Sequence, residues 1–320
     1  MKKCIIQIPC FNEEATLPVT LAELPRQLPG FDAVEWLIVN DGSTDRTIEV
    51  AREHGVHHVV DLVHNHGLAK AFMAGIEACL KLGADVIVNT DADNQYHAGD
   101  IAKLTAPVLD GSADMVVGAR PIDDIEHFSP LKKALQKMGS WVVRAASGTE
   151  VTDAPSGFRA ISRRAAMKLN VFDNYTYTLD TIIQARQKNI RVASVPVRVN
   201  GDLRPSRLVK SVSSYVKRSV LTIARVFMTY RPLRFFVALG LVPFSLGFLL
   251  GVRWLVLLFM GTDRAHVPSL VLAAILLLAG FILFVFGLLA DLLSVNRRLL
   301  EDIQHKLRQQ MLEKPDEDGS

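Results

Sequence analysis

The sequence predicts an α/β domain built on a mostly parallel sheet, followed by two helices that cross a membrane. Between residue 4 and about residue 120, apolar runs of strand length alternate with segments of helical periodicity. The runs are continuously apolar, as in parallel strands that helices cover on both faces. Further along, two uncharged segments each reach the roughly 20 residues that a helix needs to span a bilayer. Together these observations predict a Rossmann-like domain joined to a membrane anchor.

The expected strands and helices alternate along the first part of the chain. The helices are expected to begin near Glu13, Thr44, Leu68 and Gly99. The strands are expected at CIIQI (4–8), VEWLIV (34–39), HHVVDLV (57–63), ADVIVN (84–89) and ADMVVG (113–118). In such sheets, ligands bind beyond the carboxyl ends of the strands, so we expect the functional site at that edge.

Two apolar segments predict a transmembrane hairpin. Residues 235–252 carry no charge, the apolar run continues past Arg253 to residue 260, and residues 267–290 are again uncharged. Buried helices of a soluble protein need runs of about half this length, so we expect spans at 235–260 and 267–290. Basic residues gather before the first span and after the second. By the positive-inside rule, both ends of this multi-pass chain then lie in the cytoplasm, at the inner (plasma) membrane.

The segment 203–234 concentrates the positive charge of the chain. It holds eight Arg or Lys residues and no acid, although the net charge of the whole chain is only +3. Because the positive charge is confined to one segment, the chain is not a uniformly basic nucleic-acid-binding protein. Apolar residues at helical spacing in 208–230 predict an amphipathic helix on an anionic membrane face; the alternative is a helix that packs on the domain with a solvated basic side. Residues 1–202 then form a cytoplasmic domain, and residues 291–320 form a cytoplasmic tail with a short helix and a disordered end.

Polar loops follow three of the expected strands. They are PCFNEE (9–14), NDGSTD (40–45) and DADNQ (91–95), and a parallel sheet brings all of them to one edge. NDGSTD alone is also typical of a helix N-cap made by Ser43 or Thr44. Asp91 and Asp93 repel each other unless a cation lies between them, and Mg²⁺ or Mn²⁺ with phosphate oxygens is the usual solution. The chain lacks GxGxxG after its first strand and lacks GxxxxGK(S/T), which disfavours dinucleotide dehydrogenases and P-loop NTPases.

Eight short motifs occur in an order that resembles a known family. They are IPCFNEE, VNDGSTD, HGLAKAFMAG, TDADNQY, VGARP, DAPSGFRAISR, VASVPV and RPSRL. In this order they resemble the family 2 glycosyltransferases of GT-A fold, and among them the polyprenyl-phosphate sugar transferases such as dolichol-phosphate mannose synthase and its bacterial relatives. The resemblance covers about residues 3–210. It implies a membrane-bound, inverting enzyme that moves one sugar from a UDP- or GDP-sugar to a polyprenyl phosphate such as undecaprenyl phosphate.

The resemblance also implies roles for the matching residues. The positions that would surround the nucleotide sugar are Pro9, Phe11, Glu13, Val39, Asp41, Asp91, Ala92, Asp93, Gln95 and Arg120. The residues that would hold Mg²⁺ or Mn²⁺ are Asp91, Asp93 and Gln95. Those that would act on the leaving diphosphate are Asp93, Arg120 and Arg207. The loop that would border the sugar and the acceptor contributes Asp153, Ser156, Gly157, Phe158 and Arg159.

Two positions depart from the family pattern. The usual aspartate pair after the second strand is Asn40-Asp41 here, and Gly157 stands where some bacterial members carry an acid. A catalytic base is dispensable if the acceptor is a lipid monophosphate, because the second pKa of such a group is about 6. Asp153 and Asp180 are candidate ligands of the sugar or the acceptor, or else loop caps. The pair His64 and His66 has no evident third ligand, so a metal is not expected there.

Two other functions are alternatives to this one. A family 2 transferase that is processive, or that acts on a protein, a glycan or another lipid, is the first alternative. It is disfavoured, because the chain has no QxxRW signature and two spans make no polysaccharide channel. A non-catalytic membrane scaffold is disfavoured by the intact DAD, Arg120 and SGFR residues. The expected partners are therefore a nucleotide sugar, a polyprenyl phosphate and membrane lipid, and a homo-oligomer is compatible with them.

Overall fold

The computed structural model divides the chain into two compact units. The first comprises Met1–Ser219 together with Gln304–Ser320, and the second comprises Val220–Ile303. The expected amphipathic helix at 208–230 and the expected disordered end of the tail lie largely outside the described residues. The structure describes residues 1–121, 144, 148–171, 177–201, 221, 224–225, 227–261 and 267–313.

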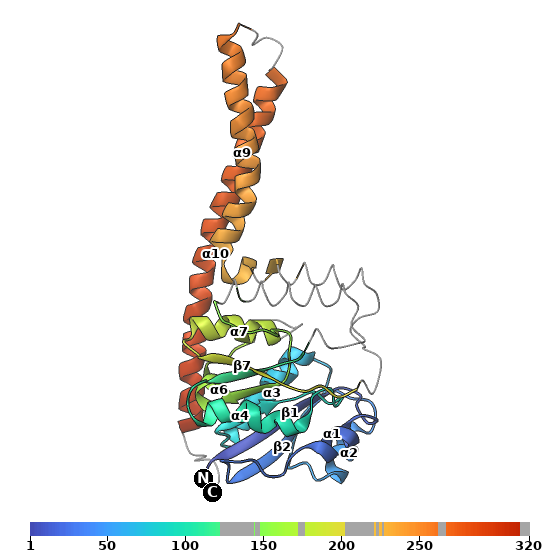
Figure 1. Cartoon of the computed structure of the whole chain (residues 1–320). Helices are drawn as coiled ribbons and strands as arrows, with labels where there is room; N and C mark the ends of the chain where they lie inside the picture. Colours follow the sequence, from blue (N-terminus) through green and yellow to red (C-terminus); the bar gives the residue numbers. More distant parts are fainter. Residues whose placement is uncertain are drawn as a thin grey trace. The chain divides into compact units, whose positions relative to one another are not determined.

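A seven-stranded sheet forms the centre of the first unit (Figure 1). Its strands are β1 (Lys3–Cys10), β2 (Ala33–Asp41), β3 (His58–Leu62), β4 (Val86–Asn89), β5 (Met115–Ala119), β6 (Arg159–Ser162) and β7 (Val192–Pro196), in the order β3-β2-β1-β4-β6-β5-β7. All neighbours are parallel except β6, which runs antiparallel to β4 and β5. The predicted, mostly parallel α/β sheet is thereby confirmed, and β1 to β5 coincide with the five expected strands.

Helices pack on both faces of this sheet. They are α1 (Leu17–Glu23), α2 (Thr47–Glu53), α3 (Leu68–Lys81), the short 3₁₀ helix η1 (Ala98–Asp100), α4 (Ile101–Leu109), α6 (Arg163–Lys168) and α7 (Thr178–Gln187). The α3 helix begins at Leu68, as predicted. The α1 and α2 helices begin a few residues later than predicted, because the residues before them hydrogen-bond between loops.

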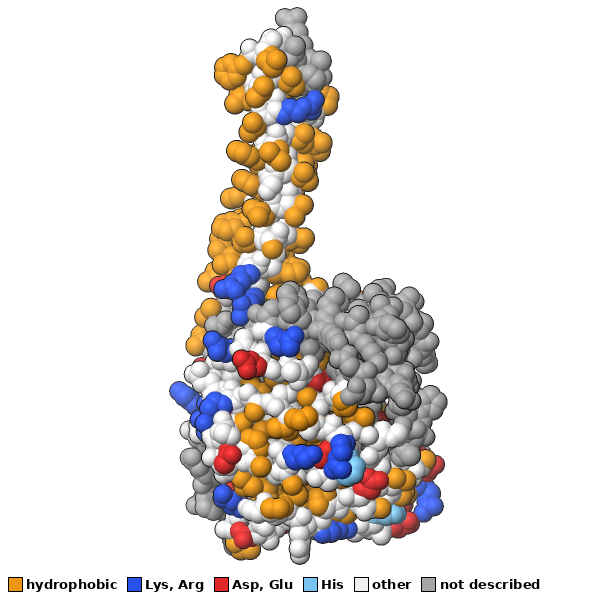
Figure 2. Space-filling view, viewed as in Figure 1, with side chains coloured by type: hydrophobic (Ala, Val, Ile, Leu, Met, Phe, Trp, Pro, Cys, Tyr) orange, Lys and Arg blue, Asp and Glu red, His pale blue; other side chains and the backbone are white. Residues whose placement is uncertain are grey.

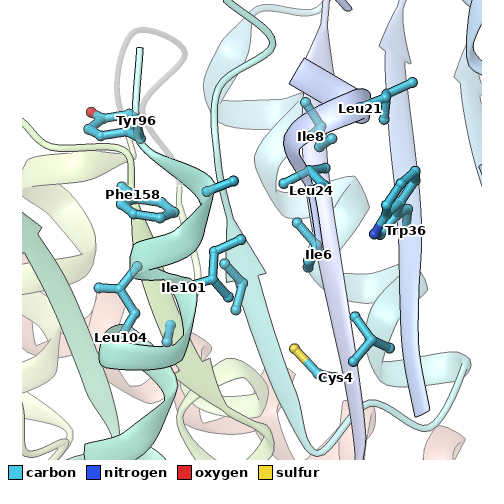
Figure 3. Packing of buried hydrophobic residues seen from close by; sticks show 14 of the residues in the cluster. Cys4, Ile6, Ile8, Leu21, Leu24, Trp36, Tyr96, Ile101, Leu104 and Phe158 are labelled. Atoms are coloured by element: carbon cyan, nitrogen blue, oxygen red, sulfur yellow. The ribbon is translucent and has the colours of Figure 1, made fainter. Parts of the chain in front are cut away.

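Successive side chains of β1 face opposite sides of the sheet. Cys4, Ile6 and Ile8 lie in one buried cluster, shown in Figure 3 with Leu21, Leu24 and Trp36. Ile5 lies in the other cluster, with residues of α3. Because helices cover both faces, β1 is apolar over most of its length, and Gln7 is its one buried polar side chain among Cys4–Cys10.

The second unit contains long apolar helices. These are α9 (Pro232–Phe259) and the part of α10 (Val267–Glu313) up to Ile303. Both helices are long and apolar enough to cross a membrane, and only 11% and 17% of their most apolar windows are buried. Figure 2 shows hydrophobic side chains along them. The expected short tail helix after residue 290 is instead a direct continuation of α10, because residues 291–313 contain neither Gly nor Pro to end a helix.

Glycines line the contact between α9 and α10 in the second unit. A Cβ atom added at Gly240 would lie 2.9 Å from the carbonyl oxygen of Gly280, and one added at Gly280 would lie 2.7 Å from Cβ of Phe244. A Cβ at Gly247 would lie 2.8 Å from the carbonyl oxygen of Ala273. The two backbones therefore approach closely, as small residues permit in membrane helices.

Candidate active site

The loops after β1 and β2 hold each other through hydrogen bonds. The Asn12 amide donates to Oγ of Ser43 (2.9 Å), and the Thr44 amide donates to Oδ1 of Asn12 (2.8 Å). Asn12 adopts a left-handed backbone conformation with φ of 55°. The Thr47 amide, at the start of α2, donates to Asp45. Ser43 and Thr44 thus join the two loops, and neither of them caps α2, whose first amide bonds to Asp45 instead.

Asp41 joins β2 to the start of α3. Its carboxylate is buried and accepts hydrogen bonds from the backbone amides of His66 (2.7 Å) and Gly67 (2.9 Å). Gly42 has a φ of 70°, and a Cβ there would lie 2.6 Å from the Asn65 amide nitrogen. The loop that carries His64 and His66 is therefore pressed against the end of β2, and both imidazoles are exposed.

The DAD segment follows β4 at the same edge of the sheet. Asp91 and Asp93 are partly buried, and between them Ala92 accepts a hydrogen bond from Oγ1 of Thr20 (2.9 Å) through its carbonyl. Burial raises the pKa of Asp91 to about 7, and the negative charges of Asp93 and Glu13 add to this effect. Negative charge at this edge is therefore only partly compensated by protein cations. Among the described residues, no group of three or more His, Cys, Asp or Glu side chains could hold a metal ion alone.

Arg120 follows β5 and forms a buried, bidentate ion pair with Asp153. Its Nε donates to Oδ2 (2.7 Å) and its Nη2 donates to Oδ1 (3.0 Å), with exposed side-chain fractions of 8% and 1%. Its Nη1 lies 3.5 Å from Oε1 of Gln95, so the guanidinium also reaches the DAD loop. The structure thus brings together two residues for which the sequence predicted separate roles.

The SGFR segment turns its backbone toward Asp91 and its arginine inward. The amide of Gly157 donates to the hydroxyl of Tyr96 (3.1 Å), and the ring of Phe158 stacks on Tyr96. Arg159 is fully buried and donates to the carbonyl oxygens of Ser156 and Ala154 (2.9 Å each) and to Thr181. The Arg159 guanidinium therefore supports the loop from inside the domain, which differs from the expected place beside the sugar.

The remaining predicted positions are distributed as follows. Pro9 is buried in β1, one residue before that strand ends, and Val39 is fully buried beside it in β2. Phe11 follows β1 and is 40% exposed. Asp180 lies in the first turn of α7. Arg207 lies outside the described residues.

Residues 5–169 match the model of a family described as "Glycosyl transferase family 2". The chain belongs to this family. It is 30% identical to a UDP-N-acetylglucosamine–dolichyl-phosphate N-acetylglucosaminyltransferase of Methanococcus voltae, over 60% of this chain and 83% of that protein. It is 29% identical to an undecaprenyl-phosphate mannosyltransferase of Micrococcus luteus, over 59% of this chain and 80% of that protein.

The fold of this family 2 glycosyltransferase also occurs in solved structures. One is a glucosyl-3-phosphoglycerate synthase from Mycobacterium tuberculosis, in complex with Mn²⁺, uridine diphosphate and glucosyl-3-phosphoglycerate. The two chains are 19% identical and superpose with a TM-score of 0.55, over 71% of this chain and 79% of the other. This likeness confirms the GT-A fold that the motifs implied.

Sequence reasoning missed several residues that build this glycosyltransferase site. Tyr96, Asn89 and Tyr177 all contact Gly157 or its carbonyl group. Asn89 had a usable signal, since it is a polar residue at the end of an apolar strand, and Tyr96 stands at the end of the TDADNQY motif. Tyr177 had none, because no motif surrounds it and only the fold brings it beside the loop.

Proposed function

We propose that this family 2 glycosyltransferase moves one sugar from a nucleotide sugar, a UDP- or GDP-sugar, to a polyprenyl phosphate, with inversion at the anomeric carbon. One observation carries the proposal. The same chain holds the acidic DAD loop, which Arg120 reaches at the carboxyl edge of the sheet, and two long apolar helices whose side chains are exposed. Relatives whose names give dolichyl phosphate and undecaprenyl phosphate as acceptors support it. The catalytic domain is residues 1–202, and the segment 203–234 lies on the cytoplasmic membrane surface.

A hard divalent cation, Mg²⁺ or Mn²⁺, fits the carboxylates after β4. Asp93 and Asp91, with Gln95 beside them, offer oxygen ligands at an edge where negative charge is only partly compensated. They are too few to complete a coordination shell, so diphosphate oxygens of the donor would supply the rest. When bound, the cation would neutralise charge on the leaving diphosphate. Asp93 is the residue that we expect to hold it most directly.

Arg120 supplies a fixed positive charge beside this edge. Asp153 orients the guanidinium through two hydrogen bonds, and the third nitrogen reaches Gln95. A cation that is already held in place does not need to reorganise when negative charge develops on a leaving group, and so stabilises that charge effectively. Arg120 would therefore favour departure of the nucleoside diphosphate.

Arg207 would bring a second cation to the same place. The chain before it runs along the DAD loop: the amide of Asn200 donates to the carbonyl of Gln95 (2.9 Å), and its side chain donates to the carbonyl of Asn94 (3.1 Å). At no more than about 3.5 Å per residue, Arg207 lies within about 25 Å of that loop. In the sequence, the basic segment follows directly after the residues that contact the DAD loop and precedes the first expected span.

Two features of the chain favour a phosphate acceptor: the basic segment 203–234 and the lack of an acidic residue at position 157. A phosphate monoester is largely ionised at neutral pH, because its second pKa is about 6, and it attacks as an anion without a base. Basic residues near the membrane surface attract such head groups. A sugar hydroxyl would need a base that the SGFR loop of this chain does not offer.

The test uses the full-length enzyme in detergent with undecaprenyl phosphate and radiolabelled UDP- and GDP-sugars. We expect label in a butanol-extractable lipid phosphate for one donor, in the presence of Mg²⁺ or Mn²⁺. Label found only in water-soluble glycan would favour the glycan-directed alternative. No transfer from any donor would favour the non-catalytic scaffold.

A further inference from the structure

A chain of buried polar side chains lies beneath the SGFR loop. Nε2 of Gln7 in β1 donates to Oδ1 of Asn89 (2.9 Å), and Nδ2 of Asn89 donates to the hydroxyl of Tyr177 (2.9 Å) and to the carbonyl of Gly157 (2.8 Å). All three side chains are 1% exposed or less. Apolar side chains of the same size would stabilise the domain about as well as these buried polar ones. The polar chain therefore points to a role in positioning the loop.

Tyr177 is held firmly within this chain. Its ring stacks on Phe72 with a centroid separation of 3.9 Å and an interplanar angle of 5°. The guanidinium of Arg159 lies 5.7 Å from the ring centroid. The hydroxyl therefore has a fixed place, next to the loop and to the end of β4.

Gly157 fits only because it has no side chain. A Cβ added there would lie 2.8 Å from the Tyr177 hydroxyl, and 3.1 and 3.3 Å from the two carboxylate oxygens of Asp91. The backbone of Gly157 shows no positive φ, so the requirement is for space and not for an unusual conformation. A side chain at position 157 therefore requires the Tyr177 hydroxyl, the Asp91 carboxylate or the loop itself to move.

We propose that Tyr177 is a positioning residue for sugar transfer. Its hydroxyl holds the backbone of Gly157 next to Asp91. The donor sugar would then face the Gly157 peptide group and no side chain. The proposal rests on the proposed function only in taking this edge as the site of the reaction. Tyr177 is only 1% exposed, so it would act on the substrates through Gly157 and Asn89.

The test compares Tyr177→Phe, Gly157→Ala and the double variant with the wild type in the full-length enzyme. Tyr177→Phe should lower kcat about 3- to 10-fold with the donor KM unchanged, because the hydroxyl loses its hydrogen bond from Asn89 (2.9 Å) and its long one to the Gly157 carbonyl (3.5 Å). Gly157→Ala should lower kcat about 10- to 100-fold, because the new methyl group displaces the loop. The double variant should be more active than Gly157→Ala alone, since phenylalanine removes the hydroxyl that the methyl group meets at 2.8 Å.

Gly201→Ala is the matched control, because a Cβ there meets nothing within 4 Å and activity should not change. Thermal unfolding of each variant separates folding from catalysis. A double variant no more active than Gly157→Ala, or a Tyr177→Phe enzyme with wild-type kcat, would overturn the proposal. If the wild type transfers label to water or glycan instead of lipid, the same comparison is made on that reaction. Failure of the acceptor assignment and failure of the Tyr177 role are therefore distinguishable.

Discussion

The ion pair of Arg120 and Asp153 joins two loops that are far apart in the sequence. Both side chains are almost fully buried, and Asp153 also accepts a hydrogen bond from the Arg120 amide (3.2 Å). A buried pair of this kind adds little net stability as a whole, but removing one partner leaves the other charge buried and uncompensated. Asp153 therefore matters both for folding and for the direction in which Arg120 points.

We expect Asp153→Ala to lower the free energy of unfolding by about 3 kcal/mol and kcat/KM by at least about tenfold. Urea unfolding in detergent and steady-state kinetics measure the two effects. Glu53→Ala is the control, because Glu53 pairs with Arg46 on the exposed surface and should cost less than about 0.5 kcal/mol. Equal stability of the two variants would show that the Arg120 pair is not buried in solution.

We expect Asp93→Ala to abolish nearly all turnover while the protein stays folded, because the carboxylate would hold the divalent ion at the diphosphate. Activity should likewise disappear in EDTA and return on addition of Mg²⁺ or Mn²⁺. Thermal unfolding serves as the check on folding. A fully active Asp93→Ala enzyme, or full activity in EDTA, would remove the metal from the mechanism.

At the residue scale, the sequence predicted which loops meet but not which side chains face outward. The convergence of the loops at Asn12, Asp41 and Asp93 follows from a parallel sheet alone. The inward direction of Arg159 does not, since a long cation is rarely fully buried and its partners are backbone carbonyls that carry no sequence signal.

At the scale of elements, strands were predicted better than the ends of helices. The β6 strand, RAIS, has only two apolar residues, too few for an apolar run, and its antiparallel direction places the SGFR loop at the same sheet edge as the DAD segment. Hydropathy predicted where the second apolar segment ends, but α10 continues well beyond that point. Charged residues mark a membrane boundary, whereas a helix ends only where a residue or a contact stops it.

The packing of α9 against α10 gives a prediction at this scale. Gly240→Ala should destabilise the hairpin by about 1–3 kcal/mol, because its Cβ meets a backbone oxygen that has no room to move. Gly251→Ala should be neutral or slightly stabilising, since its Cβ meets nothing within 4 Å and alanine favours a helix. Unfolding by sodium dodecyl sulfate in mixed micelles measures both. Equal losses in the two variants would contradict the close approach.

On the scale of the whole molecule, the first unit contains the last turns of α10. Nη1 of Arg308 donates to the carbonyls of Met167 (3.2 Å) and Leu169 (2.9 Å), and Nη2 pairs with Glu77 of α3 (3.1 Å). Nδ1 of His305 also lies 3.0 Å from the Met167 carbonyl. Arg308 thereby satisfies carbonyl groups that the end of α6 leaves open.

We expect Arg308→Ala to lower the unfolding temperature of the first unit, at a cost of about 1–3 kcal/mol, because buried carbonyls lose a charged donor. Arg308→Lys should recover only part of this loss, since an ammonium group cannot reach several oxygens in one plane. Lys306→Ala, an exposed neighbour on the same helix, is the control and should have little effect. Faster hydrogen exchange at residues 304–313 in Arg308→Ala alone would support the contact, and unchanged exchange would argue against it.

The two-part make-up of the first unit has a consequence for its synthesis. Arg308 and His305 leave the ribosome only after the whole of Val220–Ile303 has been made. At about 5–20 residues per second, that stretch takes on the order of 10 s, during which the domain has its sheet but not its final contacts. The carbonyls at the end of α6 stay open over this interval. The first unit is therefore completed only after both long apolar helices have been synthesised, so that the last step of its folding follows their translation.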